Sequence, residues 1–191
     1  MDLPRIIALG GRAGVGKDTL ASEMRRRARY QPIAFATPLY EIIARQYGVT
    51  ISFLHNRNSK ERPSPLFGGT SPRRRLQAAG DALRKRDGED VLIRQLCVRI
   101  EAEPSVRFVI TDLRLPMEAD AVRAMGGRVA KVLWPVAADH PSGLQGESDQ
   151  HRTEANDFRP DFTIVNNGTP EEVVGDLFNS LTAHTAHRKS A

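Results

Sequence analysis

The segment GGRAGVGKDT at residues 10–19 is the feature of this 191-residue chain that most restricts its fold. It directly follows the apolar run IIAL and precedes LASEMRRRARY, which can form a helix. The segment fits the pattern G-x-x-x-x-G-K-[ST], except that Asp18 takes the place of the hydroxyl residue. Glycines there let backbone N–H groups turn toward a phosphate, and the start of a helix adds its positive end. The segment therefore predicts a phosphate-binding loop between a strand and a helix.

Individual residues of this loop have expected roles. Lys17 would reach the β- and γ-phosphates of a bound nucleotide. Asp18 would hold Mg²⁺, directly or through water, and Thr19 would lie near the α-phosphate. The alternative is that Asp18 caps the helix while Thr19 takes the metal. The residues expected to bind the nucleotide in this segment are Gly11, Ala13, Gly14, Val15, Gly16, Lys17, Asp18 and Thr19.

Short apolar, β-branched runs recur between longer helical patterns, which predicts an α/β fold with a five-stranded parallel sheet. The expected strands cover residues 5–9, 33–36, 107–112, 128–134 and 161–166. Thr37 before Pro38 is expected to cap a helix that Gly48 closes, and Ser71 before Pro72 to open another.

The long connections define the expected organisation of the chain. We expect one domain over residues 1–183, with a flexible tail over 184–191. Within it, residues 37–104 form a helical substrate-binding insertion, and the Gly-, Pro- and Ser-rich residues 135–155 form a lid. An ordinary surface loop is the alternative for this second segment.

Composition places the chain among ordinary globular proteins, with 40% hydrophobic and 27% charged residues. No apolar stretch approaches the roughly 20 residues that span a bilayer, and the N-terminus shows no leader pattern, so a cytoplasmic location is expected. Cys97 lies in a helical pattern and is expected to be a small buried residue.

The net charge of +5 raises the question of a nucleic-acid partner. Only 6% of the residues are aromatic, so there is little provision for base stacking. Arginine equally suits small phosphorylated ligands. Nucleic acid is therefore not the expected partner.

The second motif is FVITDLRLPMEAD, in which an apolar strand ends at Asp112. Ligands bind at the carboxyl edge of open α/β sheets, and an aspartate there helps to hold Mg²⁺. Arg114, two residues on, can grip an acceptor phosphate. The alternatives are a cap or turn for Asp112 and a surface ion pair for Arg114.

The third motif is SPRRRLQAAGDALRKR. At helical spacing, Arg73, Gln77, Gly80 and Arg84 lie on one side of a helix, where they could face a phosphorylated substrate. A solvated basic face is the alternative.

The fourth motif is HRTEANDFRPDFTIVNNGT. His151 has no second ligand at metal-binding spacing, so a zinc site is not expected. Arg152, and after it Arg159, are candidates to stabilise the transferring phosphoryl group.

With these stretches in order, the sequence resembles the phage-type deoxynucleoside monophosphate kinases. The resemblance covers nearly the whole chain and rests on GKDT, FATPLYEIIARQYG, PRRRLQAAGDALR, ITDLRLPMEADAV and HRTE near VNNGTPEEV. Animal-type phosphomevalonate kinases are similar too, through the GKD loop, Gly80 with Arg84, and Asp112 with Arg114. Leu115 stands where their pattern has a second arginine, which favours a nucleotide acceptor.

The resemblance implies a P-loop NTPase-type three-layer fold and transfer of the γ-phosphate of ATP to a deoxynucleoside monophosphate, with Mg²⁺. It implies small-molecule partners, no membrane, and host cytoplasm if the gene is viral; a homodimer is left open. The expected catalytic residues are Lys17, Asp18, Arg84, Asp112, Arg114 and Arg152. The expected acceptor-binding residues are Arg73, Gln77, Gly80, Arg84, Arg114 and Glu154. Asp18 and Asp112 would hold the metal, and Asn167 and Gly168 the adenine. A nucleotide-binding regulator or a nucleic-acid-associated ATPase is the competing hypothesis.

Overall fold

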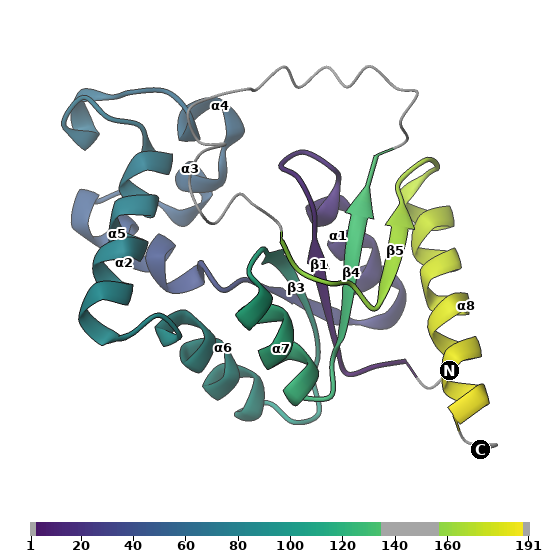
Figure 1. Ribbon diagram of the computed structural model, residues 1–191. Helices are drawn as coiled ribbons and strands as arrows, with labels where there is room; N and C mark the ends of the chain where they lie inside the picture. Colours follow the sequence, from purple (N-terminus) through teal and green to yellow (C-terminus); the bar gives the residue numbers. More distant parts are fainter. Residues whose placement is uncertain (1–2, 135–156, 189–191) are drawn as a thin grey trace. The chain divides into compact units, whose positions relative to one another are not determined.

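The computed structural model describes residues 3–134 and 157–188 of the chain (Figure 1). The strands are β1 Ile6–Gly10, β2 Tyr30–Ile33, β3 Arg107–Leu113, β4 Arg128–Leu133 and β5 Phe162–Val165. The helices are α1 Lys17–Ala28, α2 Thr37–Tyr47, α3 Ile51–His55, α4 Arg57–Lys60, the 3₁₀ turn η1 Pro65–Phe67, α5 Pro72–Asp87, α6 Val91–Glu101, α7 Pro116–Ala124 and α8 Pro170–Arg188.

The five strands form one parallel sheet in the order β2-β3-β1-β4-β5. The predicted five-stranded parallel sheet is thereby confirmed. Because β1 lies in the middle, between β3 and β4, its carboxyl end opens at the centre of the sheet edge. Connections between parallel strands need crossovers, and helices supply those that join β1, β2, β3 and β4 along the chain.

Helices cover both faces of the sheet, which explains why all five residues of β1 are buried. One face packs on α1 and α8 through alternating strand residues such as Ile7, Leu9 and Val109. On the other face, α7 packs against β1 and β4. These are the three expected layers, helix, sheet and helix.

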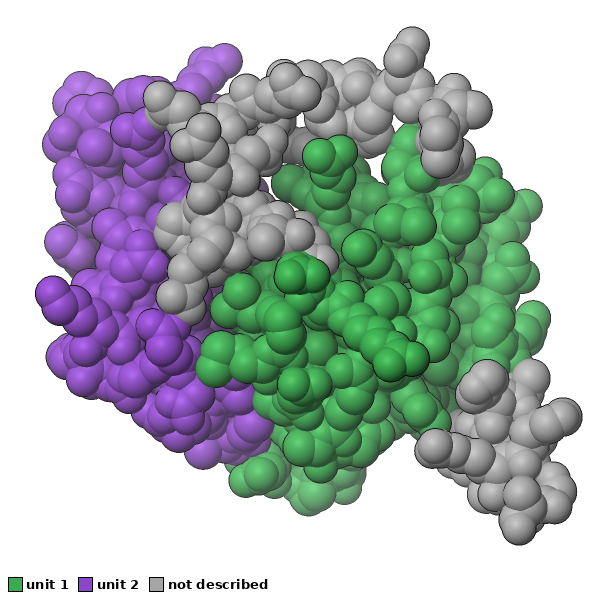
Figure 2. Space-filling view, viewed as in Figure 1, with its two compact units in different colours: residues 1–34, 99–191 green, residues 35–98 purple. Residues whose placement is uncertain are grey.

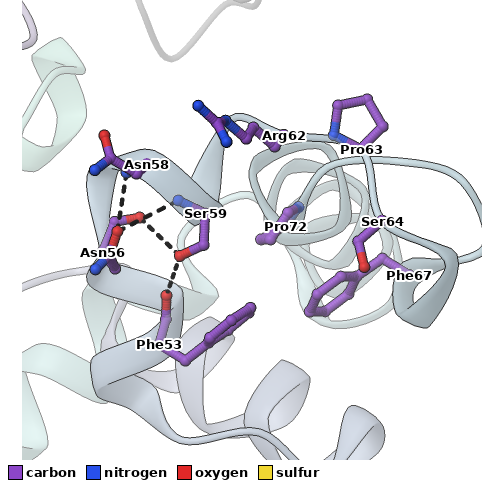
Figure 3. Close-up of a pocket in the computed structure, with 9 residues that line it drawn as sticks. All are labelled: Phe53, Asn56, Asn58, Ser59, Arg62, Pro63, Ser64, Phe67 and Pro72. Carbon is purple, nitrogen blue, oxygen red and sulfur yellow. Dashed lines mark hydrogen bonds between the residues drawn. The ribbon is translucent and has the colours of Figure 1, made fainter.

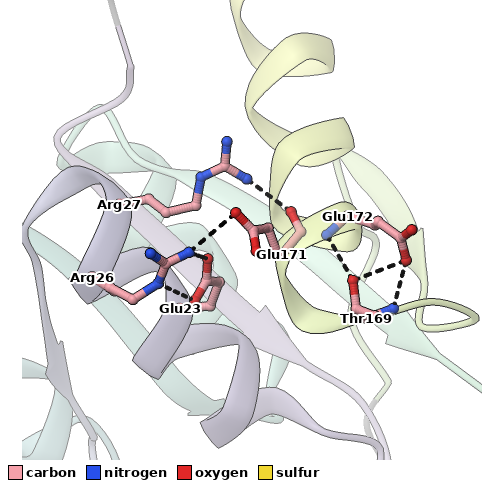
Figure 4. Close-up of polar contacts among 6 residues, drawn as sticks. All are labelled: Glu23, Arg26, Arg27, Thr169, Glu171 and Glu172. Atoms are coloured by element: carbon pink, nitrogen blue, oxygen red, sulfur yellow. Dashed lines mark hydrogen bonds and ion pairs between the residues drawn. The ribbon is translucent and has the colours of Figure 1, made fainter.

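Polar contacts join α1 to the start of α8 (Figure 4). Arg27 donates a hydrogen bond to the backbone oxygen of Glu171 at 2.8 Å. Arg26 lies between two carboxylates, at 2.7 Å from Glu23 and 3.3 Å from Glu171. These contacts fix the N-terminal turn of α8, which directly follows the end of β5.

The chain divides into two compact units (Figure 2). The first consists of residues 1–34 and 99–191 and contains the sheet with α1, α7 and α8. The second, residues 35–98, is helical and contains α2 to α5 with η1. In it, α2 packs on α3 and α5, and α4 packs on α3 and α5.

Two local predictions are wrong. The second strand is Tyr30–Ile33, not 33–36, and Pro32 lies inside it. Proline lacks the N–H that a central strand needs, but β2 is an edge strand, where proline is tolerated. Thr37 is the first residue of α2 and does not cap it; the N-cap is Ala36.

Other helix boundaries agree with the predictions from the sequence. Gly48 ends α2 at φ 64°, and the Ser71 hydroxyl accepts a hydrogen bond from Arg74 N at the start of α5, as predicted. Cys97 is partly rather than fully buried. The backbone of α8 continues to Arg188, beyond residue 183. Within the described stretches, no helix is long and apolar enough to cross a membrane.

Candidate active site

The loop after β1 has the glycine conformations that a phosphate loop requires. Gly11, Gly14 and Gly16 have φ values of 136°, 81° and 93°, where residues with a Cβ are strained. The Lys17 ammonium donates hydrogen bonds back to Gly11 O at 2.8 Å and Arg12 O at 2.9 Å. The lysine thus lies across the loop, where an anionic ligand would compete with the two carbonyl oxygens for it.

The two glycines at the end of β1 allow close packing. A Cβ at Gly10 would lie 2.1 Å from the Phe158 ring, and one at Gly11 would lie 2.4 Å from Val132 O of β4. The start of the loop therefore packs directly against Phe158 and β4. Phe158 itself is buried, a packing role that the sequence did not reveal.

The start of α1 shows whether Asp18 caps this helix. The N-cap of α1 is Gly16, which has no side chain to offer, and Asp18 lies in the first helical turn. In residues 3–134 and 157–188, the Asp18 carboxylate forms no hydrogen bond or ion pair. Asp18 is exposed and is not the cap of this helix. A negative side chain near a helix N-terminus is stabilised there by the helix dipole.

Asp112 lies where β3 departs from regular pairing with β1. Ala8 pairs with Ile110 but Gly10 pairs with Leu113, so Thr111 and Asp112 together face one residue of β1. Such a bulge changes the direction of a side chain and is frequent beside active sites. It lies next to the start of the phosphate loop, and both Asp112 and Arg114 are half-buried.

Glu118, to which we assigned no role, holds the turn that follows Asp112. Its side chain is 6% exposed and accepts hydrogen bonds from Arg114 N at 2.8 Å and Leu115 N at 3.0 Å. The carboxylate thereby fixes the backbone of Arg114. The signal was present in the sequence, since a glutamate three residues after Leu115, with Pro116 between, is typical of a helix N-terminus.

On α5, in the helical unit, one predicted residue has a buried polar atom without a partner, and another is a buried arginine with one long ion pair. The Arg84 side chain is 9% exposed, and its one contact among the described residues is Asp81 at 3.5 Å. The Gln77 amide nitrogen is buried and has no partner in the described part of the chain. A buried amide without a partner is costly, and a buried guanidinium with one long ion pair has donors to spare, so both groups are suited to bind a ligand.

The other two predicted residues of α5 have structural contacts. Arg73 is paired with Glu61, with nitrogen–oxygen distances from 2.6 to 2.9 Å. A Cβ at Gly80 would lie 3.2 Å from Leu39 Cδ1 and from Arg84 Nη1. Gly80 therefore allows α2 and the Arg84 side chain to pack closely on α5.

The residue that directly follows β5 lies beside the phosphate loop. Asn166, partly buried, donates a hydrogen bond from Nδ2 to Val15 O at 3.0 Å. Asn167 and Gly168 are exposed. The other nucleotide-binding candidates, Ala13 and Thr19, are exposed too.

The remaining predictions concern residues 135–159. Arg152, Glu154 and the lid at 135–155 lie outside the described residues, as does His151. The Arg159 side chain is exposed, and its backbone oxygen accepts a hydrogen bond from Arg123.

A cavity of about 420 Å³ lies in the helical unit, between α4, η1 and the start of α5 (Figure 3). Most of its polar side chains are used locally: Asn56 caps α4, Ser64 caps η1, and the Ser59 hydroxyl donates to Phe53 O. The cavity reaches α5 at Pro72. Along α5, Pro72 lies twelve residues, or about 18 Å, before Arg84, so this end of the cavity lies about three helical turns from Arg84.

Comparisons with known proteins agree with this architecture. The chain is 28% identical over 193 residues to a protein of Acanthamoeba polyphaga mimivirus named "Putative deoxynucleotide monophosphate kinase", covering 92% of this chain and 95% of that protein. Shikimate kinase from Acinetobacter baumannii superposes with a TM-score of 0.50 at 13% identity, covering 96% of this chain and 95% of that one. The chain has a P-loop kinase fold. A Thermus thermophilus protein of known structure superposes on this P-loop kinase fold with a TM-score of 0.52 at 21% identity, covering 95% and 98% of the two chains. No protein-family profile matches the sequence.

Proposed function

We propose that this protein is an ATP-dependent kinase that transfers the γ-phosphate to a deoxynucleoside monophosphate, giving the diphosphate. Residues 1–183 would form the kinase domain and residues 37–104 would bind the acceptor. The observation that carries the proposal is the glycine loop after β1, with Lys17 lying across it, in a chain similar over 92% of its length to the mimivirus protein.

The donor side of the proposal rests on the loop and the start of α1. Backbone N–H groups of the loop and of the N-terminus of α1, which has no side-chain cap, could bind the phosphates of ATP. Lys17 would exchange its two carbonyl partners for the β- and γ-phosphates. Thr19 would lie near the α-phosphate, and Asn167 and Gly168 near the adenine.

The carboxylates near the loop fit a magnesium ion. Among the described residues, no group of three His, Cys, Asp or Glu side chains could hold a metal without help. Mg²⁺ needs fewer protein ligands, because it commonly binds one or two carboxylates together with substrate phosphates and water. Asp18 and Asp112 would supply these carboxylates. When bound, the ion neutralises charge on the β- and γ-phosphates.

The acceptor side rests on α5 and on the end of β3. Gln77 and Arg84 are seven residues apart, so they lie on the same face of α5. A phosphate at Arg84 would satisfy a guanidinium that has one distant partner. Arg114, held by Glu118 through its backbone, would bind the same phosphate. Arg73 and Gly80 line this face.

The chemistry that these residues would carry out is positioning. Phosphoryl transfer needs aligned reactants and neutralised charge, and it requires no protein nucleophile. Arg152 would stabilise the transferring group, and Glu154 would contact the acceptor.

A product assay tests the proposal. The protein is incubated with ATP, Mg²⁺ and each of a panel of deoxynucleoside and ribonucleoside monophosphates plus phosphomevalonate, and the products are separated by chromatography. We expect a deoxynucleoside diphosphate, and no product with Lys17→Ala. Phosphorylation of phosphomevalonate would favour the small-molecule alternative. ATP hydrolysis that depends on DNA or RNA, without a phosphorylated mononucleotide, would favour the nucleic-acid-associated ATPase.

A further inference from the structure

Asn166 connects the last strand to the phosphate loop across 151 positions of the sequence. Its backbone N–H donates to Leu133 O at 2.8 Å, which extends the pairing of β5 with β4 by one residue. Its side-chain amide donates to Val15 O at 3.0 Å. The side chain is thus anchored by the sheet and reaches into the loop.

This contact fixes one peptide unit of the loop. Every described peptide bond is trans, so the Val15 carbonyl and the Gly16 N–H point in opposite directions. Because Asn166 holds the carbonyl on its own side, the Gly16 N–H must point away from Asn166. Backbone N–H groups in this part of a phosphate loop are the groups that cradle phosphates.

Packing reinforces the contact. A Cβ at Gly16 would lie 2.4 Å from Nδ2 of Asn166, so the amide lies directly against the Gly16 Cα. Gly16 also has a φ of 93° and is the N-cap of α1. The amide therefore occupies space that glycine leaves open, and it limits rotation of the 15–16 peptide.

We infer that Asn166 is a positioning residue that orients the Val15–Gly16 peptide for the phosphates of ATP. The inference rests on the nucleotide-binding part of the proposed function. It requires an amide at this position, because the Val15 carbonyl needs a donor. An aspartate would have the same shape but would place a carboxylate against the carbonyl oxygen.

Binding measurements test this role independently of the phosphotransfer reaction. The affinities of ATP and of adenosine are measured by calorimetry for the wild type, Asn166→Ala and Asn166→Asp. One neutral hydrogen bond corresponds to about a three- to tenfold change in affinity. We expect ATP to bind three- to tenfold more weakly to Asn166→Ala and more weakly still to Asn166→Asp, with adenosine binding unchanged.

Matched controls are Asn179→Ala and Asn179→Asp, at an exposed asparagine of α8. They should leave both affinities unchanged. Thermal melting identifies any variant that does not fold; Asn166→Ala introduces no charge, so it carries the test if Asn166→Asp is unstable. The KM for the acceptor should not change in Asn166→Ala.

The outcomes separate this inference from the proposed function. Equal losses of ATP and adenosine binding, or no loss of either, would overturn the positioning role. A wild-type protein that binds ATP but phosphorylates no nucleotide would overturn the proposed function, while a selective loss of ATP binding in Asn166→Ala would still support the inference. A wild type that does not bind ATP would overturn both.

Discussion

Asp18 is the residue at which this loop departs from the common pattern, and its environment favours a metal role over a capping role. It is exposed, near a helix N-terminus, and Gly16 already serves as the N-cap. We expect Asp18→Ala to raise the Mg²⁺ concentration needed for half-maximal activity and to lower kcat strongly. Thr19→Ala should leave the metal dependence near that of the wild type and chiefly weaken ATP binding. A magnesium titration of both variants measures this, and a metal dependence that follows Thr19 alone would reverse the assignment.

Arg84 and Arg114 are expected to share the acceptor phosphate. Removal of either guanidinium should lower kcat/KM for the monophosphate by a factor that corresponds to about 2–5 kcal/mol of free energy, the range for buried charge pairs. ATP binding should change little. Arg86→Ala is the matched control for Arg84→Ala, since Arg86 is an exposed arginine of the same helix that pairs with Asp87. Steady-state kinetics with each substrate varied gives the comparison. Near wild-type values in both variants would remove these arginines from the acceptor site.

Glu118 offers a test that separates charge from hydrogen bonding. Both backbone N–H groups donate to the same oxygen, Oε2, so a glutamine can accept both of them through its single carbonyl. Glu118→Ala would leave two N–H groups without a partner, at about 1–3 kcal/mol each. We therefore expect urea unfolding to find Glu118→Ala much less stable than Glu118→Gln. Equal losses would mean that the charge, and not the two bonds, holds the turn.

At the scale of elements, the start of α8 depends on a reciprocal cap. Thr169 N and Oγ1 donate to the Glu172 carboxylate at 2.8 and 2.9 Å, and Glu172 N donates to Thr169 Oγ1 at 3.3 Å (Figure 4). These bonds, first that from the backbone N–H and then that from the hydroxyl, lower the pKa of Glu172. This is the capping box expected of a T-x-x-E sequence.

The lowered pKa of Glu172 predicts a pH dependence with a definite sign. The charged carboxylate stabilises the folded state above its unfolded pKa, and this contribution is lost as the pH falls through the lower folded pKa. Glu172→Gln should therefore be less stable than the wild type at neutral pH, and the difference should shrink on acidification below the ordinary glutamate pKa. Asp176→Asn, at an exposed carboxylate of α8 beyond its first turn, is the control. Chemical unfolding across this pH range measures both, and a difference that grows in acid would contradict the assignment.

The elements also mark the limits of sequence interpretation. Strand β4 was predictable because it is a short run with three buried apolar residues, Val129, Ala130 and Val132, as a strand covered on both faces requires. Strand β2 was misplaced because only Ile33 of the more apolar run at 33–36 lies in the strand. Residues 34–36 form the turn before α2, whereas the true strand contains Pro32. The short helices α3 and α4 were not predicted, since four or five residues contain too little periodicity.

The same limit applies to the candidate site. The glycine loop could be predicted because all its parts are adjacent in sequence. The contact of Asn166 with Val15 could not, because it depends on a sheet order that brings residues 151 positions apart together. The burial of Gln77 Nε2 without a partner and of Arg84 with one long ion pair likewise depends on packing within the helical unit, which no local pattern encodes.

At the scale of the whole molecule, part of the positive charge already lies in ion pairs. Several arginines of the described residues lie beside carboxylates, namely Arg26, Arg73, Arg86, Arg94 and Arg123. Paired arginines release fewer counterions on binding a polyanion. We expect added DNA or RNA to leave ATP hydrolysis unchanged at physiological salt, in a coupled ATPase assay. Stimulation by either nucleic acid would favour the ATPase alternative.

The strand order has a consequence for folding during synthesis on the ribosome. Strand β1 is made first, yet its two neighbours are β3 and β4, and β2 also pairs with β3. The first 34 residues therefore have no strand partners until residue 107 and beyond have been translated. At about 5–20 residues per second, β1 must wait several seconds or longer for its sheet. During that interval the growing chain can complete α2 to α5, so the helical unit can form before the sheet, although β1 and β2 precede it in the sequence.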